Sequence, residues 1–272
     1  MKFIYKLITI SVASLFAISC QDSAQDERIT LTGSSTVAPV VADAAKAYEA
    51  SHPEYRIDVQ TGGSSRGIAD AKSGLADMGM ISRALKEEES DLTAHRIAVD
   101  GVCVITHDTN PIENLTRAQL IDIYTGKISN WKDVGGPAQE IVVVNKAAGR
   151  ATLEVFLNYV GLDSADVQAD VVAGENQQAI KTVAGNESAI GYVSIGAAAS
   201  EADAGTAIKL VSCDGVPAST ASVASGEFPI TRPLQVVTLG EVSPAAAAFL
   251  EYLKSSQIND IIESHLYVPI SN

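Results

Sequence analysis

The stretch LTGSSTVAPV, residues 31–40, joins two segments of opposite character. Residues 28–32 alternate polar and apolar side chains, as a β-strand does, and residues 37–50 carry apolar side chains at helical spacing. Pro39 fits the first turn of such a helix, where a missing N–H is tolerated. Between the two segments lie three adjacent hydroxyls, Ser34, Ser35 and Thr36, and no charged residue. A strand that leads directly into a helix is the repeating unit of an α/β fold.

The same alternation continues along the chain. Strands are predicted at residues 57–59, 76–80, 97–106, 141–144, 189–193 and 234–239, and helices at 66–73, 116–124, 152–160, 177–184, 244–254 and 257–263. Strands alternating with helices predict mostly parallel sheets covered by helices. A chain of 272 residues is long enough for two such α/β units, with crossings expected near residues 106 and 232.

Composition and net charge exclude some classes of binding partner. The chain is 46% hydrophobic and 19% charged, as soluble globular proteins are, and its formal net charge is −14. Such a negative charge argues against nucleic acid and against an anionic membrane surface. Beyond the N-terminus, no stretch is long and apolar enough to span a bilayer.

The first 19 residues have the pattern of an export signal, with Lys2 and Lys6 before an apolar run at 7–18. Two processing alternatives remain open. Ala17-Ile18-Ser19 suits the general signal peptidase, whereas Cys20 suggests a bacterial lipoprotein acylated at that cysteine, and we favour the second. Residues 20–27 would then form a polar tether, and the mature chain would carry a net charge of −16. We expect an exported protein, periplasmic or at the cell surface, that touches the membrane only through this anchor.

Two cysteines remain after Cys20. Cys103 and Cys213 are an even number in an exported chain and could form a disulfide. Both lie in apolar, strand-like runs, where a free cysteine behaves as a small hydrophobic residue. We favour free cysteines, and the sequence leaves the pairing open.

Two further junctions resemble the first in composition. TGGSSRG, residues 61–67, follows the strand at 57–59, and AAGRAT, residues 147–152, follows the strand at 141–144. A helix start leaves backbone N–H groups without intrahelical partners and carries about half a unit of positive charge. Small residues let an anion approach that backbone, and hydroxyls add donors. A single hydroxyl could instead be an ordinary N-cap, worth about 1 kcal/mol. Three such junctions in one chain favour an oxyanion site.

Arginines accompany two of the strand ends. Arg150, in the third junction, opposes the macrodipole of its own helix unless it faces an anion. Arg83 follows Ser82 directly after the strand at 76–80. The alternative for Arg83 is an ion pair with the acidic run at 87–89.

Five segments, in order, resemble the phosphate-binding proteins of bacterial Pst transporters. They are LTGSSTVAPV (31–40), TGGSSRGIADAKSGLADMGMISR (61–83), AVDGVCVITHDTNPIENLT (98–116), LIDIYTGKISNWKDVGG (120–136) and AIGYVSIG (189–196). The resemblance runs from about residue 29 to the C-terminus. It implies a two-lobed type II periplasmic binding protein, each lobe a mostly parallel sheet flanked by helices. The lobes would be residues 28–105 plus 233–272 and residues 106–232, joined by a two-segment hinge. A monomer without cofactor or metal would enclose inorganic phosphate and deliver it to the permease of an ABC transporter.

The resemblance also implies ligand positions. They fall in the first junction, in the second, after the strand at 76–80, and in the third: Ser34, Ser35, Thr36, Ser64, Ser65, Ser82, Arg83, Gly149, Arg150, Ala151 and Thr152.

Four positions depart from the family pattern. Lys146 and Ala148 stand where an arginine and an aspartate are usual, and Arg150 replaces a serine. Arg83 stands where some members have an aspartate that accepts the proton of hydrogen phosphate. Sulfate has no such proton, so another group must supply this discrimination. A binding protein for sulfate, molybdate or tungstate is therefore the main alternative, and a phosphate sensor or adhesin of the same fold is another.

An enzyme is not expected. The histidines at 52, 95, 107 and 265 lack the close spacing of metal ligands, and no G-x-S-x-G nucleophile motif is present.

Overall fold

The computed structural model describes residues 27–270. The predicted signal peptide and the lipidation site Cys20 lie outside the described residues. So does the tether except Glu27, which is the first residue of a strand. Within the described part of the chain, no helix is long and apolar enough to cross a membrane.

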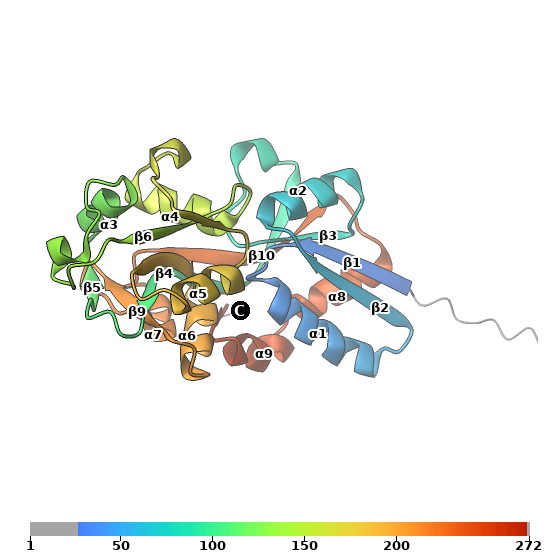
Figure 1. The fold of residues 1–272 in the computed structure, drawn as a ribbon. Helices are drawn as coiled ribbons and strands as arrows, with labels where there is room; N and C mark the ends of the chain where they lie inside the picture. The colour runs from blue at the N-terminus through green and yellow to red at the C-terminus, as the bar shows by residue number, and fades with distance from the viewer. Residues whose placement is uncertain (1–26, 271–272) are drawn as a thin grey trace, which may run out of the picture.

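Three parallel strands form one end of the molecule (Figure 1). In the order β2 (Tyr55–Thr61), β1 (Glu27–Gly33) and β3 (Met78–Ile81), they are connected through helices α1 (Ala38–Ser51) and α2 (Ser64–Ser73). Helix α2 is followed by Gly74, whose left-handed backbone (φ +72°) suits glycine. Each of these strands ends beside the start of a helix or a loop, as the junctions at 31–40 and 61–67 predict.

A second parallel set forms the other end, with β6 (Val142–Lys146) between β7 (Val171–Ala173) and β8 (Ala189–Ser194). Helices pack around it: α3 (Arg117–Tyr124), α4 (Ala151–Val160), α5 (Asn176–Ala184), α6 (Ile195–Asp203) and α7 (Thr220–Ala224). Short 3₁₀ turns lie at Trp131–Val134 and Ser164–Asp166, and another follows β3 at Glu87–Glu89.

Two long strands connect these ends, β4 (Leu92–His107) and β10 (Thr231–Leu239). Residues 92–101 of β4 pair with β10, whereas residues 102–107 pair with β8 and with β9 (Ile208–Cys213). All these pairs are antiparallel, as is the pair of β3 with β10. The sheet is therefore mixed, because the strands that pass between the two ends run against their neighbours. The parallel pairs predicted from the strand–helix alternation lie on either side of them.

The remaining elements complete both ends. They are β5 (Asn114–Leu115), α8 (Pro244–Lys254), a 3₁₀ turn at Ser256–Ile258, α9 (Asn259–Ser264) and β11 (Val268–Pro269). The helix predicted at 257–263 is thus split into a 3₁₀ turn and a short α-helix.

Buried hydrophobic side chains form two large clusters. One draws on residues 29–98 and 234–267, and the other on residues 102–230. Strand β4 contributes to both, with Ile97 and Ala98 in the first and Val102 to Ile105 in the second. Cys103 and Cys213 are buried in the second cluster as free cysteines, which answers the question of their pairing.

Candidate functional site

A small cavity lies where the two ends of the molecule meet, and most of the predicted site residues line it. These are Ser34, Ser35, Thr36, Ser64, Ser82, Arg150, Ala151 and Thr152. Four further residues complete the lining: Gly63, Lys146, Gly174 and Asn176. The three sequence junctions thus meet at one place. This follows from topology: the junctions follow β1, β2 and β6, and the parallel strands of each set present their carboxyl ends at the same edge.

Four helices begin at this cavity without a side-chain cap. The N-cap residues of α1, α2, α4 and α5 are Val37, Gly63, Arg150 and Glu175, and none accepts a capping hydrogen bond through its side chain. By contrast, a serine or threonine side chain caps each of α3, α6, α7 and α8. Among the helices that start elsewhere, α9 also lacks a side-chain cap. The four helices that start at the cavity direct the positive ends of their dipoles toward it.

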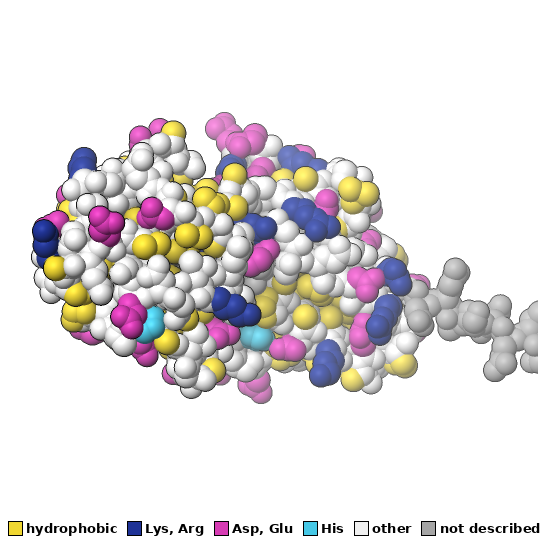
Figure 2. All heavy atoms as spheres, viewed as in Figure 1, with side chains coloured by type: hydrophobic (Ala, Val, Ile, Leu, Met, Phe, Trp, Pro, Cys, Tyr) yellow, Lys and Arg dark blue, Asp and Glu magenta, His cyan; other side chains and the backbone are white. Residues whose placement is uncertain are grey.

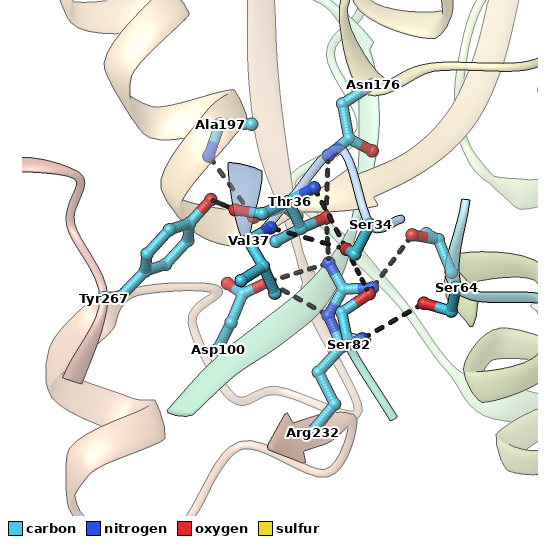
Figure 3. A network of polar contacts seen from close by, with 12 residues as sticks. Ser34, Thr36, Val37, Ser64, Ser82, Asp100, Asn176, Ala197, Arg232 and Tyr267 are labelled. Carbon is cyan, nitrogen blue, oxygen red and sulfur yellow. Dashed lines mark hydrogen bonds and ion pairs between the residues drawn. The ribbon is translucent and has the colours of Figure 1, made fainter. Parts of the chain in front are cut away.

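Among the hydroxyls that line the cavity, Ser34 accepts hydrogen bonds from backbone N–H groups just before α1. Its Oγ accepts from the backbone N–H groups of Thr36 and Val37 at 3.2 and 3.4 Å, one turn before α1. The same Oγ donates to Ser82 Oγ at 3.0 Å. Ser82 in turn donates its backbone N–H to Ser64 Oγ at 3.1 Å. Figure 3 shows these serines, which follow β1 and β3 or begin α2, gathered around one point.

Arg150 approaches the cavity from the N-terminus of α4. Its Nη1 lies 2.5 Å from Glu175 Oε1, and the side chains are 20% and 35% exposed. Glycines make room for it: a Cβ on Gly63 would lie 3.0 Å from Arg150 Cδ, and one on Gly174 would lie 3.5 Å from Arg150 Nη2. Gly63 also has a φ of +93°, which side chains rarely adopt.

Lys146 brings a second cation, at the end of β6. Its side chain is buried, and Nζ donates to the carbonyl of Glu175 at 2.9 Å and to Asn176 Oδ1 at 3.3 Å. Burial, together with the charges of Arg232 and Arg150, lowers the pKa of Lys146 to about 7, and Glu175 opposes this shift. An anion in the cavity would restore the charged form of this amine.

A third cation lies behind the hydroxyls. Arg232, on β10, is buried with Asp100 of β4, and its Nε and Nη2 lie 3.0 and 2.8 Å from Asp100 Oδ2. The guanidinium also contacts the hydroxyls of Ser82 and Thr36, which Figure 3 shows, and the hydroxyl of Thr152. Neither residue was predicted from the sequence to be part of the site. Two features of the sequence could have indicated them: Asp100 is an acidic residue inside the apolar run of β4, and Arg232 lies at the expected crossing between the two units.

Positive charge is thus gathered inside the molecule. Lys146, Arg150 and Arg232 face Asp100 and Glu175, and no Asp or Glu is among the residues that line the cavity. On the face in Figure 2, Lys and Arg side chains lie singly or in small groups among acidic ones. Within residues 27–270, no group of three or more His, Cys, Asp or Glu is arranged to hold a metal ion. The arrangement can bind an anion through N–H and O–H donors.

Comparison with known proteins identifies the family. A family model described as a PBP superfamily domain matches residues 20–257. The phosphate-binding protein PstS of Bacillus subtilis is 31% identical over 264 residues, which cover 93% of this chain and 86% of the relative. The chain belongs to the PstS family.

Solved structures agree with this membership. A putative phosphate ABC transporter substrate-binding protein from Clostridium perfringens, solved with bound phosphate, is 32% identical with a TM-score of 0.84. The match covers 90% of this chain and 100% of the Clostridium perfringens chain. An ABC-type phosphate transport receptor from Vibrio cholerae is 31% identical with a TM-score of 0.74, at the same coverage. The architecture is accordingly the mixed α/β fold of type II periplasmic binding proteins.

Three positions expected from the PstS pattern do not line the cavity. Two of them touch each other: Ser65 donates its backbone N–H to the carbonyl of Gly149 at 3.2 Å. This bond joins the second and third junctions beside the cavity.

Arg83 is the third such position and has other partners. Its guanidinium makes two hydrogen bonds of 2.7 Å to Glu89, and its Nε lies 3.1 Å from Glu154 Oε2. The hydrogen bond from Arg83 holds the pKa of Glu89 below its usual value. The acidic run at 87–89 therefore supplies the partner that the sequence analysis gave as the alternative for Arg83.

A larger cavity of about 400 Å³ adjoins the first and shares Ser35 and Asn176 with it. It differs in charge. No Lys or Arg lines it, and its ionisable side chains are Glu175, His265 and Tyr267, of which His265 lies 2.8 Å from Asp43. Such a lining does not attract an oxyanion, so within this PstS member the smaller cavity is the candidate site.

Proposed function

We propose that this PstS-family protein captures inorganic phosphate between two lobes outside the cytoplasm and delivers it to the permease of an ABC transporter. The observation that carries the proposal is the meeting of four helix N-termini without side-chain caps, a ring of hydroxyls and two cations on one cavity. Dipoles and N–H groups of this kind bind oxyanions. Charge-assisted bonds from Lys and Arg strengthen the contact. Binding needs no covalent step, and the protein is a binding protein and not an enzyme.

Each predicted ligand position receives a role in this proposal. Direct contacts come from Ser35, Thr36, Ser64, Ser82, Arg150, Ala151 and Thr152, to which we add Lys146 and Asn176. Ser34 acts through Ser82, to which it donates a hydrogen bond. Ser65 and Gly149 hold the second and third junctions together. Arg83 supports the loop after β3 through Glu89.

The guanidinium lies at a different position from the arginine of the PstS pattern. The usual arginine position carries Lys146, whose ammonium is a point charge. Arg150 brings the planar fork that can bind one oxyanion through two bonds. The cavity thus keeps a guanidinium but holds it on the third junction, beside Glu175.

The proposal divides the chain into lobes at residues 28–105 plus 233–272 and at residues 106–232. The two hydrophobic clusters support this division, since they divide near the same positions. Strands β4 and β10 would serve as the two hinge segments, because both connect the ends of the molecule. Closure of such lobes around a ligand is a common hinge motion.

We further propose that residues 1–19 direct export, that Cys20 carries the lipid anchor, and that the monomer touches a membrane only there. The negative charge of the chain supports the absence of nucleic acid as a partner. The permease is the expected protein partner.

One observation favours a second candidate, a binding protein for another tetrahedral oxyanion such as sulfate, molybdate or tungstate. No carboxylate lines the cavity, so no acid is positioned to accept the proton of hydrogen phosphate. A site without such an acceptor lacks the group that would repel a fully ionised anion.

Calorimetric titration of ligand-free protein, residues 21–272, with phosphate, sulfate and molybdate at pH 6 and pH 8 distinguishes the two candidates. We expect tight binding of phosphate and no heat with sulfate. Sulfate or molybdate binding more tightly than phosphate would replace the first candidate by the second, and no heat with any of the three would exclude both.

A further inference from the structure

The guanidinium of Arg232 has every N–H donor engaged. An arginine offers five such donors and no acceptor. Two go to Asp100 Oδ2, from Nε at 3.0 Å and Nη2 at 2.8 Å. The second N–H of Nη2 points to Thr36 Oγ1 at 3.1 Å. The two of Nη1 reach Thr152 Oγ1 at 2.9 Å and Ser82 Oγ at 3.4 Å. Arg232 therefore has no donor left for an anion.

The three hydroxyls that Arg232 contacts all line the anion cavity. Each hydroxyl has one proton and two acceptor positions. A hydroxyl that accepts from Arg232 loses one acceptor position and keeps its proton for another partner. We infer that Arg232 is a positioning residue of this site, which holds the hydroxyls of Thr36, Ser82 and Thr152 as donors to the bound oxyanion. The inference rests on the proposed function and adds to it a residue behind the site.

Thr36 illustrates the effect most fully. Its Oγ1 accepts from Arg232 Nη2 at 3.1 Å and from Asn176 Nδ2 at 3.2 Å. Both acceptor positions are then occupied, so the hydroxyl can only donate. Figure 3 shows Asn176 and Arg232 reaching Thr36 from opposite sides.

Ser82 is held in the same way through a short chain of bonds. Ser34 Oγ already accepts from two backbone N–H groups, so its own proton goes to Ser82 Oγ. Ser82 Oγ also accepts from Arg232 Nη1. Its acceptor positions are filled, and its proton remains for the cavity. Ser82 and Thr36 therefore cannot accept the proton of a hydrogen phosphate, and they bind its bare oxygens.

Arg232 also joins segments of the two hydrophobic clusters. Thr36 and Ser82 follow β1 and β3, whose side chains belong to one cluster. Thr152 lies in the first turn of α4, whose Leu153 and Phe156 belong to the other. One buried side chain thus orients donors on both sides of the cavity at once. Its charge is matched by Asp100, so its main contribution is orientation and not net attraction.

The experiment compares phosphate binding by calorimetry in the wild type and in the double variant Arg232→Gln with Asp100→Asn. Removing both charges avoids leaving one of them buried alone. We expect a phosphate Kd at least about 30-fold higher, because hydrogen bonds to a charged ligand are worth roughly 10- to 100-fold each in affinity. Arg96→Gln, an exposed arginine of the same strand β4, is the matched control and should bind as the wild type does.

A second measurement separates positioning from a merely structural role. Thr152→Val is introduced into the wild type and into the double variant. We expect the valine to weaken binding about 10-fold or more in the wild type and less than about 2-fold in the double variant, because an unoriented hydroxyl contributes little. Far-UV circular dichroism and thermal melting confirm that each variant folds.

Each outcome of these measurements supports or overturns the positioning role of Arg232. Unchanged phosphate affinity in the double variant, or an equal effect of Thr152→Val in both backgrounds, overturns the role of Arg232 while leaving the proposed function intact. If the double variant does not fold, the same cycle is run with Arg232→Met and Asp100→Leu, which remove the donors and replace the ion pair by apolar side chains. Equal effects of Thr152→Val there also overturn the role of Arg232. A wild type that binds no phosphate excludes the proposed function and this inference together.

Discussion

Arg232 and Asp100 stand directly opposite each other in the antiparallel pair of β10 and β4, and their side chains form an ion pair that is 1% exposed on each side. The pair lies at the positions where β4 changes its partner from β10 to β8, since pairing with β10 ends at Gly101 and pairing with β8 begins at Val102. A buried, desolvated pair therefore sits at the crossing between the two ends of the molecule, immediately behind the hydroxyls of the anion cavity.

Breaking this pair should destabilise the protein strongly. In Asp100→Ala the guanidinium stays buried without its carboxylate, which costs about 3–5 kcal/mol in the free energy of unfolding. Urea denaturation measures this value. Asp70→Ala is the control, because its pair with Arg66 is much more exposed and contributes about 0.5 kcal/mol or less. Equal losses in the two variants would contradict the view that burial makes the Asp100 pair important.

Arg150 should be necessary for tight anion binding. Arg150→Ala removes a guanidinium that lines the cavity and leaves Glu175 facing the anion, so we expect phosphate affinity to fall about 100-fold or more. Arg66→Ala is a close match on the second junction, where the arginine donates to Asp70 and to the carbonyl of Thr61. That control should bind phosphate as the wild type does. Near-wild-type affinity in Arg150→Ala would show that the third junction is misassigned.

The hydroxyl of Thr36 can be tested with a nearly isosteric change. Thr36→Val removes one donor to the anion and leaves Asn176 and Arg232 without their acceptor, so we expect affinity to fall about 10- to 100-fold. Thr32→Val is the control on the preceding strand. Its Oγ1 is buried without a hydrogen-bond partner, so the valine should leave binding unchanged and maintain or raise stability. A loss of binding in both variants would mean that the effect is not specific to the site.

Much of this site could be predicted from local composition. Runs of hydroxyls and small residues predict the three junctions at 31–40, 61–67 and 147–152, and the resemblance to the Pst phosphate-binding proteins implies the individual positions at 34–36, 64, 82 and 150–152. Lys146 appeared only as a departure from a family pattern. Asn176 was missed because a single amide at a helix start carries no distinct signal.

The pair of Arg232 and Asp100 could not be predicted for a different reason. The two residues are 132 positions apart, and they meet only because β10 pairs with β4 in one particular register. A shift by one residue would turn either side chain to the opposite face of the sheet. Arg83 illustrates the opposite case. The sequence left two partners open for it, a bound anion or the acidic run at 87–89, and in the folded chain it pairs with Glu89 of that run.

Lys146 should make anion binding depend on pH. In the free protein its pKa is lowered to about 7, chiefly by burial, and a bound anion raises it again. Binding therefore takes up a proton above pH 7, and affinity for a given anionic form falls as pH rises from 7, by at most about tenfold per pH unit. Arg232, Arg150 and Glu175 are the charged groups that act on this amine.

Calorimetry of phosphate binding at pH 8, in buffers with different ionisation enthalpies, measures the proton uptake. Lys146→Arg is the matched control, since its guanidinium stays charged throughout this range. The wild type should take up more protons per phosphate than this variant does. Equal uptake in both proteins would show that Lys146 does not titrate on binding.

Gly63 should be necessary for closing the site. Its φ is +93°, and a Cβ there would lie 2.8 Å from the carbonyl oxygen of Gly149 and 3.0 Å from Arg150 Cδ. Gly63→Ala must therefore push the third junction away from the second, which would break the bond from Ser65 N–H to Gly149 and displace Arg150. We expect phosphate affinity to fall about 30-fold or more, because a misplacement near 1 Å weakens several bonds to the anion together.

Gly74→Ala separates this effect from backbone strain alone. Gly74 also has a positive φ, +72°, but a Cβ there meets nothing within 4 Å. The strain in this control should lower stability by about 1 kcal/mol and leave phosphate affinity unchanged. If Gly63→Ala also changed only the stability, contact between the second and third junctions would not be part of anion binding.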